Sequence, residues 1–438
     1  AGAWRDGASG ETAQSGDTAK TGDTAKTGDV VTIRMWGGVP AESGPQAACD
    51  AFNEAYKDKG IQVEYERFVN DDTGNVKLET NLLGGNEIDV YMSYTMAQLS
   101  KRAEGNMALD LTELCERDGF DLTQYLGDLA KNYYVDGKPF CIPCKLDQYG
   151  MVVNKTMFDE AGIEVPTEWT YDEFLDVCAK LTHGEGTDKV YGVFWNSQQD
   201  MAQYAQFMIQ QTLGGDNMYN ADGTATNFTD DVWQKTISLI STTMNEGYAP
   251  THADSVTEKL SQESMFLGGK AAMTIGPWMV RNIKDTETYP HDFVTAFAPY
   301  PVVSEGQRNY TQGGYGDLLC INPRSEHLDE AWEFAKWYLT EGGLYLASGG
   351  RVPAANTYNA DDVVNAFLSG AENLFDADST KAVLITPHDN YAAPSITTKN
   401  AELTDIINEE LEAIYTGQKT VEEGLESAKT RGDAALAG

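Results

Sequence analysis

Three tryptophans stand at the ends of predicted strands, where an indole ring would be open to a ligand. Trp36 closes the apolar run that begins at Val30, Trp195 follows the run 190–194, and Trp278 stands in a Gly-Pro-Trp turn. A flat aromatic ring offers an apolar face, and ligands of open α/β sheets bind at strand ends. Trp278 is the preferred platform for a ligand, with core packing as its weaker alternative, whereas core packing is an equal alternative for Trp36 and Trp195.

Polar and aromatic side chains near other predicted strand ends are further ligand-binding candidates. Asp147 and Tyr149 are two residues apart and so share one face of an extended segment. Arg351, in the loop Gly-Gly-Arg-Val-Pro, could hydrogen-bond a ligand or pair with an acidic residue. Tyr94, just after the third predicted strand, could contact a ligand or pack in the core.

A glycine pair, Gly313 and Gly314, precedes the apolar run 318–321. Glycine has no Cβ, so backbone amides there can approach a ligand closely or serve a hinge. Both glycines are therefore counted with the candidate ligand-binding residues.

The net charge of the 438-residue chain is -37, which argues against nucleic-acid binding because phosphate backbones would be repelled. The acidity is typical of a soluble protein, with a cationic ligand such as a polyamine as the alternative. Hydrophobic residues make up 41% of the chain, so most of it is expected to fold into globular domains.

Catalytic and metal-binding motifs are missing from the sequence. It contains no GxSxG, HExxH or P-loop pattern, and its five histidines are scattered without ligand spacing. Cys141 and Cys144 have no second Cys or His pair at zinc-site spacing, so we interpret them as structural thiols or a local disulfide. We expect no enzyme, no cofactor and no metal, although a glycan-active enzyme with two opposed carboxylates remains a weaker alternative.

The first folded elements position Trp36 and Tyr94. Apolar runs and alternating residues predict strands at 30–36, 61–68 and 88–92, and amphipathic spacing predicts helices at 46–58 and 76–83. This order predicts a doubly wound, largely parallel α/β sheet.

Later segments continue the α/β pattern. Thr170 and Glu173 form a capping-box pattern at a helix start. Short strands are predicted at 271–275 and 293–298, and helices at 327–341 and 401–430, the last interrupted by Gly417 and Gly424.

Residues 1–29 are predicted to be a disordered tether. The hexapeptide GDTAKT occurs at 16–21 and again at 22–27, in a segment that has almost no large apolar side chains. Such a polar spacer cannot bury enough surface to fold. It is the kind of segment that holds an extracellular protein away from a membrane.

Seven motifs, in order along the chain, resemble those of the extracellular solute-binding proteins of ABC importers, the family that includes maltose-binding protein. The most specific is Phe266–Trp278, which resembles the family's "fxxGkaAMxxxGpW". The others are Glu87–Val90, Asp136–Pro143, Gly150–Lys155, Gly313–Ile321, Ala331–Lys336 and Tyr415–Glu423. The segment 150–155 corresponds to the family's crossover strand, with Val152 and Val153 in place of the usual tyrosines.

The resemblance implies a two-lobe, type II periplasmic-binding-protein-like fold that closes on its ligand by hinge motion. Lobe 1 would comprise residues 30–144 with 312–345, and lobe 2 residues 145–311 with 346–438. It also implies that the acidic Asp147 accepts hydrogen bonds from sugar hydroxyls, with a surface-loop aspartate as the alternative.

The function implied is capture of a small molecule, preferably a mono- or oligosaccharide, by a monomeric protein that delivers it to an ABC permease. The implied location is extracellular, anchored to the membrane as a lipoprotein, or periplasmic. A nonsugar solute such as a polyamine or a peptide remains the alternative ligand.

Overall fold

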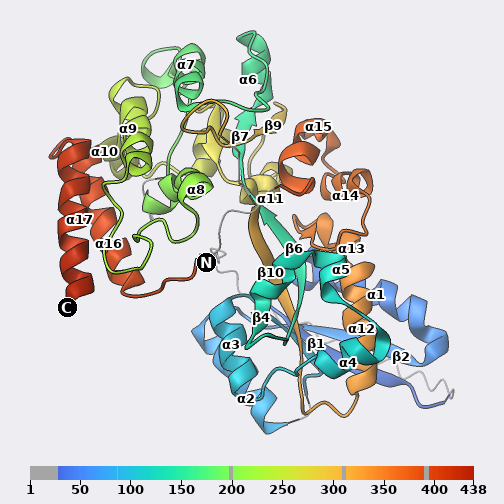
Figure 1. Ribbon diagram of the computed structural model, residues 1–438. Helices are drawn as coiled ribbons and strands as arrows, with labels where there is room; N and C mark the ends of the chain where they lie inside the picture. The colour runs from blue at the N-terminus through green and yellow to red at the C-terminus, as the bar shows by residue number, and fades with distance from the viewer. Residues whose placement is uncertain (1–27, 86, 197–200, 308–311, 389–393) are drawn as a thin grey trace. The chain divides into compact units, whose positions relative to one another are not determined.

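In the computed structural model, the chain forms two compact units (Figure 1). The structure describes residues 28–85, 87–196, 201–307, 312–388 and 394–438. Unit 1 extends to Lys145 and adds Tyr315–Leu346 and Ala354–Thr357; unit 2 comprises Leu146–Gly314, Ala347–Pro353 and Tyr358–Gly438. All of the predicted tether except residues 28 and 29 lies outside the described residues.

A mixed sheet forms the centre of unit 1, and its first three strands are parallel, as the sequence predicts. Strand β1 (Val31–Gly37) lies between β2 (Ile61–Arg67) and β3 (Val90–Ser93) and runs parallel to both. β10 (Gln312–Ile321) pairs antiparallel with β3. The strand order is β11-β6-β10-β3-β1-β2, which places the carboxyl ends of β1, β2 and β3 at one edge.

Amphipathic helices pack on this sheet. Helix α12 (Leu328–Thr340) buries the predicted stripe that includes Ala331, Trp332 and Tyr338. α2 (Asp72–Gly84) begins earlier than predicted because the Asp71 side chain accepts a hydrogen bond from the Gly74 amide and caps the helix. The other helices are α1 (Pro45–Tyr56), α3 (Met96–Glu104), α4 (Thr112–Asp118), α5 (Leu122–Leu126) and α13 (Gly343–Ala347), with 3-10 turns η1 (Ala41–Ser43), η2 (Lys57–Lys59) and η3 (Asp128–Tyr133) and a β4–β5 hairpin (Tyr134–Val135, Lys138–Pro139).

The strands that continue from one unit into the other are β6 (Ile142–Gln148) and β10. The sequence instead assigned this crossover to residues 150–155. Those residues form β7 (Met151–Asn154), which is the central strand of the unit 2 sheet β8-β7-β9 and pairs antiparallel with both neighbours. Pairing on both sides and full burial explain why its sequence is plainly apolar.

Unit 2 surrounds its small sheet with helices, and the predicted capping box of Thr170 and Glu173 is present at the start of α7. The predicted strands are β8 (Met273–Ile275) and β9 (Thr295–Ala298), and the short β11 is Val352–Pro353. The helices are α6 (Lys155–Glu160), α7 (Tyr171–Leu181), α8 (Met201–Leu213), α9 (Asp231–Asn245), α10 (His252–Thr257), α11 (Val280–Lys284), α14 (Ala360–Phe367), α15 (Ala377–Thr380), α16 (Asn400–Tyr415) and α17 (Val421–Ala437). Short 3-10 segments are η4 (Gly186–Asp188), η6 (Pro277–Met279) and η7 (Glu372–Leu374), and π-helical segments are η5 (Glu263–Leu267) and η8 (Lys381–Ile385).

Helices α16 and α17, drawn in red in Figure 1, lie side by side. Gly417 lies in the turn between them with a φ of 78°. Gly424, however, does not interrupt a helix. It lies inside α17, where an added Cβ would come within 2.4 Å of Ile414, so the glycine allows the two helices to pack closely.

A buried carboxylate joins these two helices. The Glu410 side chain is 4% exposed and lies 2.7 Å from Lys419 Nζ and 2.9 Å from Arg431 Nη1, and the Ser427 hydroxyl donates to it at 2.7 Å. Burial alone would raise the pKa of Glu410, but the hydrogen bonds from Lys419, Ser427 and Arg431 outweigh it and lower that pKa.

Replacing Glu410 by glutamine should therefore destabilise the α16–α17 pair in a pH-dependent way. A carboxyl group whose pKa is lowered by folding stabilises the protein above its unfolded pKa, and that contribution is lost as pH falls through the folded pKa. We expect Glu410→Gln to lower the free energy of unfolding by about 2 kcal/mol at pH 7, since both cations are partly exposed.

Urea unfolding at pH 7 and near pH 3 measures this effect, and the difference between wild type and Glu410→Gln should shrink at the lower pH. Asp405→Asn is the matched control, because Asp405 is an exposed acid on the same helix. An equal loss of unfolding free energy at both pH values would show that the ionised Glu410 carboxylate does not provide this stabilisation.

Candidate functional site

At the carboxyl end of β1, two tyrosines hold the backbone of Gly37-Gly38-Val39, which we call the glycine loop. The Gly38 amide donates to the Tyr94 hydroxyl at 2.6 Å, and the Tyr65 hydroxyl donates to the Val39 carbonyl. A Cβ on Gly37 would lie 2.6 Å from the Tyr65 hydroxyl, and one on Gly38 would lie 3.0 Å from the Tyr94 ring. Only glycine lets both rings lie directly on the loop.

Tyr94 is itself held in place from two sides. Its amide donates to Gln98 Oε1 at 2.8 Å, and its half-buried ring packs beside Phe68 with centroids 6.4 Å apart. The sequence left the role of Tyr94 open between ligand contact and core packing. The structure places it at the strand-end edge of unit 1, supporting the glycine loop.

Trp36 lies in the core of unit 1, directly before the glycine loop. It is 4% exposed and packs with Leu78, Leu82 and Tyr91. The Nζ atom of Lys77 stands 5.7 Å from its ring. Of the two alternatives that the sequence offered for Trp36, this position corresponds to core packing.

Four aromatic side chains of unit 2 gather around Phe207 of α8, and we call these five residues the aromatic cluster. The ring centroids of Tyr149 and Trp278 lie 5.0 Å and 6.0 Å from that of Phe207. Tyr204 and Tyr300 complete the cluster, at 6.3 Å and 6.0 Å. Trp278 is half-buried whereas the other four rings are buried, so Trp278 is the member with the most surface to offer a solute.

Two glycines leave room for these rings. A Cβ on Gly313 would lie 2.3 Å from Cε2 of Tyr149. Gly276 has a φ of 131°, and its added Cβ would lie 2.3 Å from Cε2 of Trp278. Gly313 therefore allows close packing against Tyr149, while Gly314, with a φ of 94°, occupies a conformation that favours glycine.

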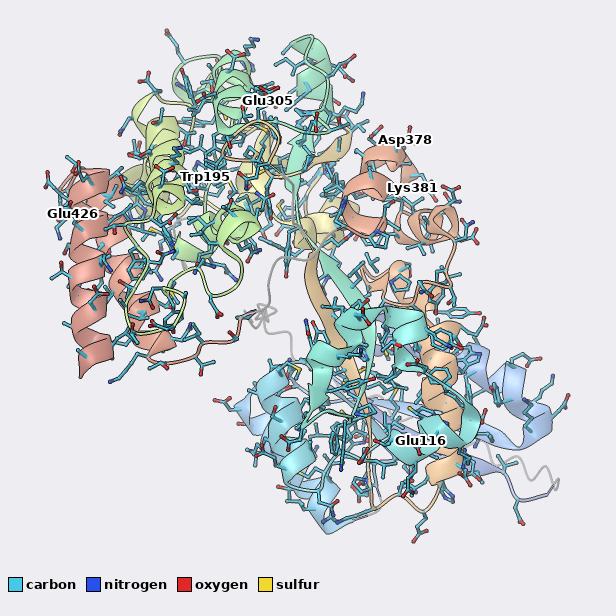
Figure 2. The ribbon with its side chains drawn as sticks, in the orientation of Figure 1. Glu116, Trp195, Glu305, Asp378, Lys381 and Glu426 are labelled. Atoms are coloured by element: carbon cyan, nitrogen blue, oxygen red, sulfur yellow. The ribbon has the colours of Figure 1, made fainter. Side chains whose placement is uncertain are left out.

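Trp195, labelled in Figure 2, is a core residue of unit 2. It is 4% exposed, and its indole Nε1 donates to Thr243 Oγ1 at 2.9 Å inside the helical layer. Its ring also lies 6.0 Å from that of Phe174. As with Trp36, the structure places Trp195 in the packing role that the sequence kept as its alternative.

Asp147 is half-buried near the end of β6, and Arg351 is half-buried just before β11. Between Asp147 and Tyr149 lies Gln148, a residue that sequence reasoning did not select. Its Nε2 donates to the carbonyls of Leu384 and Thr386 at 3.0 Å, and its Oε1 accepts from the His388 amide at 2.7 Å. Gln148 thus fixes the end of β6 beside the aromatic cluster residue Tyr149.

Sequence reasoning also missed Phe207, Tyr204 and Tyr300, and in unit 1 it missed Tyr65. The available signal was the spacing of Tyr204 and Phe207, which are three residues apart and so share one face of a helix. That signal resembles ordinary core patterning, so it does not single out a site.

Cys141 and Cys144 are buried free thiols. Burial raises the pKa of each well above the usual value for a thiol. Within the described ranges, no group of three or more His, Cys, Asp and Glu side chains is arranged to hold a metal ion. Nor does any helix in the described part of the chain have the length and apolar character needed to cross a membrane.

Residues 37–344 match the family model of the bacterial extracellular solute-binding proteins. The chain belongs to this family. Its members are solute-binding proteins rather than enzymes, which confirms both the resemblance and the expectation that the chain is not an enzyme.

Curated relatives of this solute-binding protein are distant. A multiple sugar-binding protein of Streptococcus mutans is 25% identical over 218 residues, which is 48% of this chain and 50% of that protein. The chain thus spans half the length of that relative. A putative binding protein of Brucella abortus is 21% identical over 327 residues, 73% of this chain and 74% of the other.

Solved structures show the same fold. A sugar transporter of Rhizobium etli, in an open conformation, matches with a TM-score of 0.73 at 20% identity, covering 92% of this chain and 99% of that one. The sugar-binding protein MalE of Xanthomonas citri matches with a TM-score of 0.67 at 18% identity, covering 93% and 98%. The expected α/β fold of type II periplasmic binding proteins is confirmed.

Proposed function

We propose that this solute-binding protein captures a sugar or oligosaccharide for an ABC importer. The observation that carries the proposal is the aromatic cluster of unit 2, in which half-buried Trp278 is backed by buried Phe207. An aromatic face binds the apolar C–H face of a sugar ring, and neighbouring polar groups then orient the hydroxyls. The distant relationship to a multiple sugar-binding protein supports the same ligand class.

The proposed ligand contacts come from both units. In unit 2 they are Trp278 as the stacking platform, Tyr149 beside it, Asp147 and Arg351 as polar partners, and the backbone at Gly313 and Gly314. In unit 1 they are Tyr94 and the glycine loop. Trp36 and Trp195 are not included, because both are buried in the cores of their units.

We further propose that the protein is monomeric, closes on its ligand by hinge motion and delivers it to a membrane permease. The family is extracellular, and an ABC substrate-binding protein of Listeria monocytogenes, solved with cycloalternan, shares the fold with a TM-score of 0.62. Ligand contacts made only in the closed state would favour closure by their differential affinity. Attachment as a lipoprotein through the segment before Val30 belongs to the same proposal.

A thermal-shift screen tests the ligand class. The purified protein would be heated with maltose, maltotriose, raffinose and other oligosaccharides, and separately with spermidine and short peptides. Binding stabilises the folded state by RT ln(1 + [L]/Kd), so a micromolar sugar at millimolar concentration should add about 4 kcal/mol. Stabilisation by spermidine or peptides, with no response to any carbohydrate, would refute the proposed function.

A further inference from the structure

Asn70 stands at the strand-end edge of unit 1, beside the glycine loop. The Phe68 amide donates to the Gly37 carbonyl at 2.9 Å, so the chain that leaves β2 runs along the loop. The Asp71 amide then donates to the Val69 carbonyl at 2.9 Å, which makes Asn70 the tip of a three-residue turn. A Cβ on Gly38 would lie 3.2 Å from the Cβ of Asn70.

A buried arginine determines how a nearby amide is oriented. Arg102 is 0% exposed, and its Nη2 donates to the side chain of Asn75 at 2.8 Å while Nη1 donates to Ser93 Oγ at 2.7 Å. A guanidinium carries only donors. The Asn75 atom that faces Arg102 must therefore be the carbonyl oxygen, and the Asn75 amide nitrogen must face the other way.

The orientation of Asn75 in turn determines that of Asn70. The Asn75 amide nitrogen donates to Asn70 Oδ1 at 3.0 Å and to the Asp71 carbonyl at 2.9 Å. Since Asn70 meets this donor with its oxygen, its own amide nitrogen points away from Asn75. Asn70 is exposed, and within the described ranges its Nδ2 has no hydrogen-bond partner.

We propose that Asn70 is a ligand-binding residue of unit 1 that presents a hydrogen-bond donor of fixed orientation, with Asn75 and Arg102 as its positioning residues. An outward donor suits a ligand with acceptor oxygens, such as the hydroxyls of a sugar. It disfavours a polyamine, whose ammonium groups have only hydrogens to offer. This inference rests on the proposed function and narrows its ligand class.

The tip position leaves the fold little dependent on the Asn70 side chain. In Asn70→Ala, Asn75 keeps its hydrogen bonds to the Asp71 carbonyl and to Arg102. The variant therefore removes the proposed donor while leaving the Arg102 network in place. Asn106→Gly is the control, since Asn106 is an exposed asparagine of unit 1 that follows the opposite end of α3 from Tyr94. Its φ of 55° suits glycine and would strain an alanine.

Calorimetric titration of wild type, Asn70→Ala and Asn106→Gly with maltotriose, raffinose and spermidine tests the ligand contact. We expect wild type to bind at least one of the two sugars. Asn70→Ala should raise the Kd for that sugar about fivefold, as loss of one hydrogen bond predicts. Asn106→Gly should leave the Kd for that sugar unchanged. If Asn70→Ala binds the sugar as tightly as wild type does, the role of Asn70 is wrong but the proposed function stands. If wild type binds spermidine more tightly than either sugar, both the role of Asn70 and the proposed function are wrong.

The orientation of the two amides can be tested without any ligand. The protein would be labelled with 15N-asparagine, and the variants Asn70→Ala and Asn75→Asp would assign the two side-chain signals. The side-chain NH2 of Asn75 should exchange slowly with water, and that of Asn70 should exchange rapidly. The reverse pattern, with the Asn70 NH2 protected, would show that its oxygen faces outward and would overturn the inference even if no test sugar binds.

Discussion

Replacing Trp278 by alanine should weaken sugar binding by about 30-fold, the largest effect that we expect from any single ligand contact. Removal of an anchoring aromatic ring from a binding site costs about 2 kcal/mol, which corresponds to that change in Kd. The ring is half-buried against Phe207, so part of its face is available to a solute. Titration calorimetry with the sugar that gives the largest thermal shift measures the effect.

Trp337→Ala serves as the control for Trp278→Ala. Trp337 is also a half-buried tryptophan, but it lies on α12 of unit 1 and packs against Phe52 with ring centroids 5.4 Å apart. Its removal should lower stability and leave the Kd unchanged. If both variants weakened binding equally, the specific role of Trp278 would be wrong.

Replacing Gly276 by alanine should both destabilise unit 2 and abolish high-affinity sugar binding. Its φ of 131° disfavours any residue with a Cβ, and the new methyl group would lie 2.3 Å from the Trp278 ring. Backbone strain and overpacking together should lower the free energy of unfolding by about 3 kcal/mol. The displaced indole should also change its fluorescence spectrum.

Chemical denaturation followed by tryptophan emission would record the loss of stability and the displacement of the indole in Gly276→Ala, and titration with the sugar that wild type binds would record the loss of binding. Gly84→Ala is the control, because a Cβ at Gly84 would meet nothing within 4 Å and its φ is not positive. That variant should unfold like wild type. Wild-type stability and emission in Gly276→Ala would show that neither strain nor ring displacement occurs.

The framework of unit 1 could be predicted because local pattern and tertiary structure agree there. The strands at 30–36, 61–68 and 88–92 end at glycines or polar turns, and β1 to β3 follow them with shifts of only a few residues at their ends. At Gly424, inside α17 of unit 2, local pattern and tertiary structure disagree. Glycine lowers helix propensity and so predicts an interruption, but contact with Ile414 on the neighbouring helix makes a small residue favourable at that position.

The candidate site was less predictable because its members come from distant parts of the chain. Trp278 was selected from its turn, but Phe207, which backs it, lies on a helix whose apolar pattern is that of a core element. Tyr65 reaches the glycine loop only because β2 pairs with β1 in the register that joins Tyr65 to Met35. Asn70 gains its orientation from Arg102, a dependence that residue spacing does not reveal.

The state of the cysteines makes this protein suitable for site-directed labelling. All six thiols are free, and five of them are buried. Cys115 is half-buried, and burial together with the acidic neighbours Asp121, Asp110 and Asp118 raises its pKa to about 11. Thiolate is the species that reacts with maleimides, so native cysteines should label slowly near neutral pH. One new surface cysteine in each unit could therefore carry a fluorophore without first removing the others.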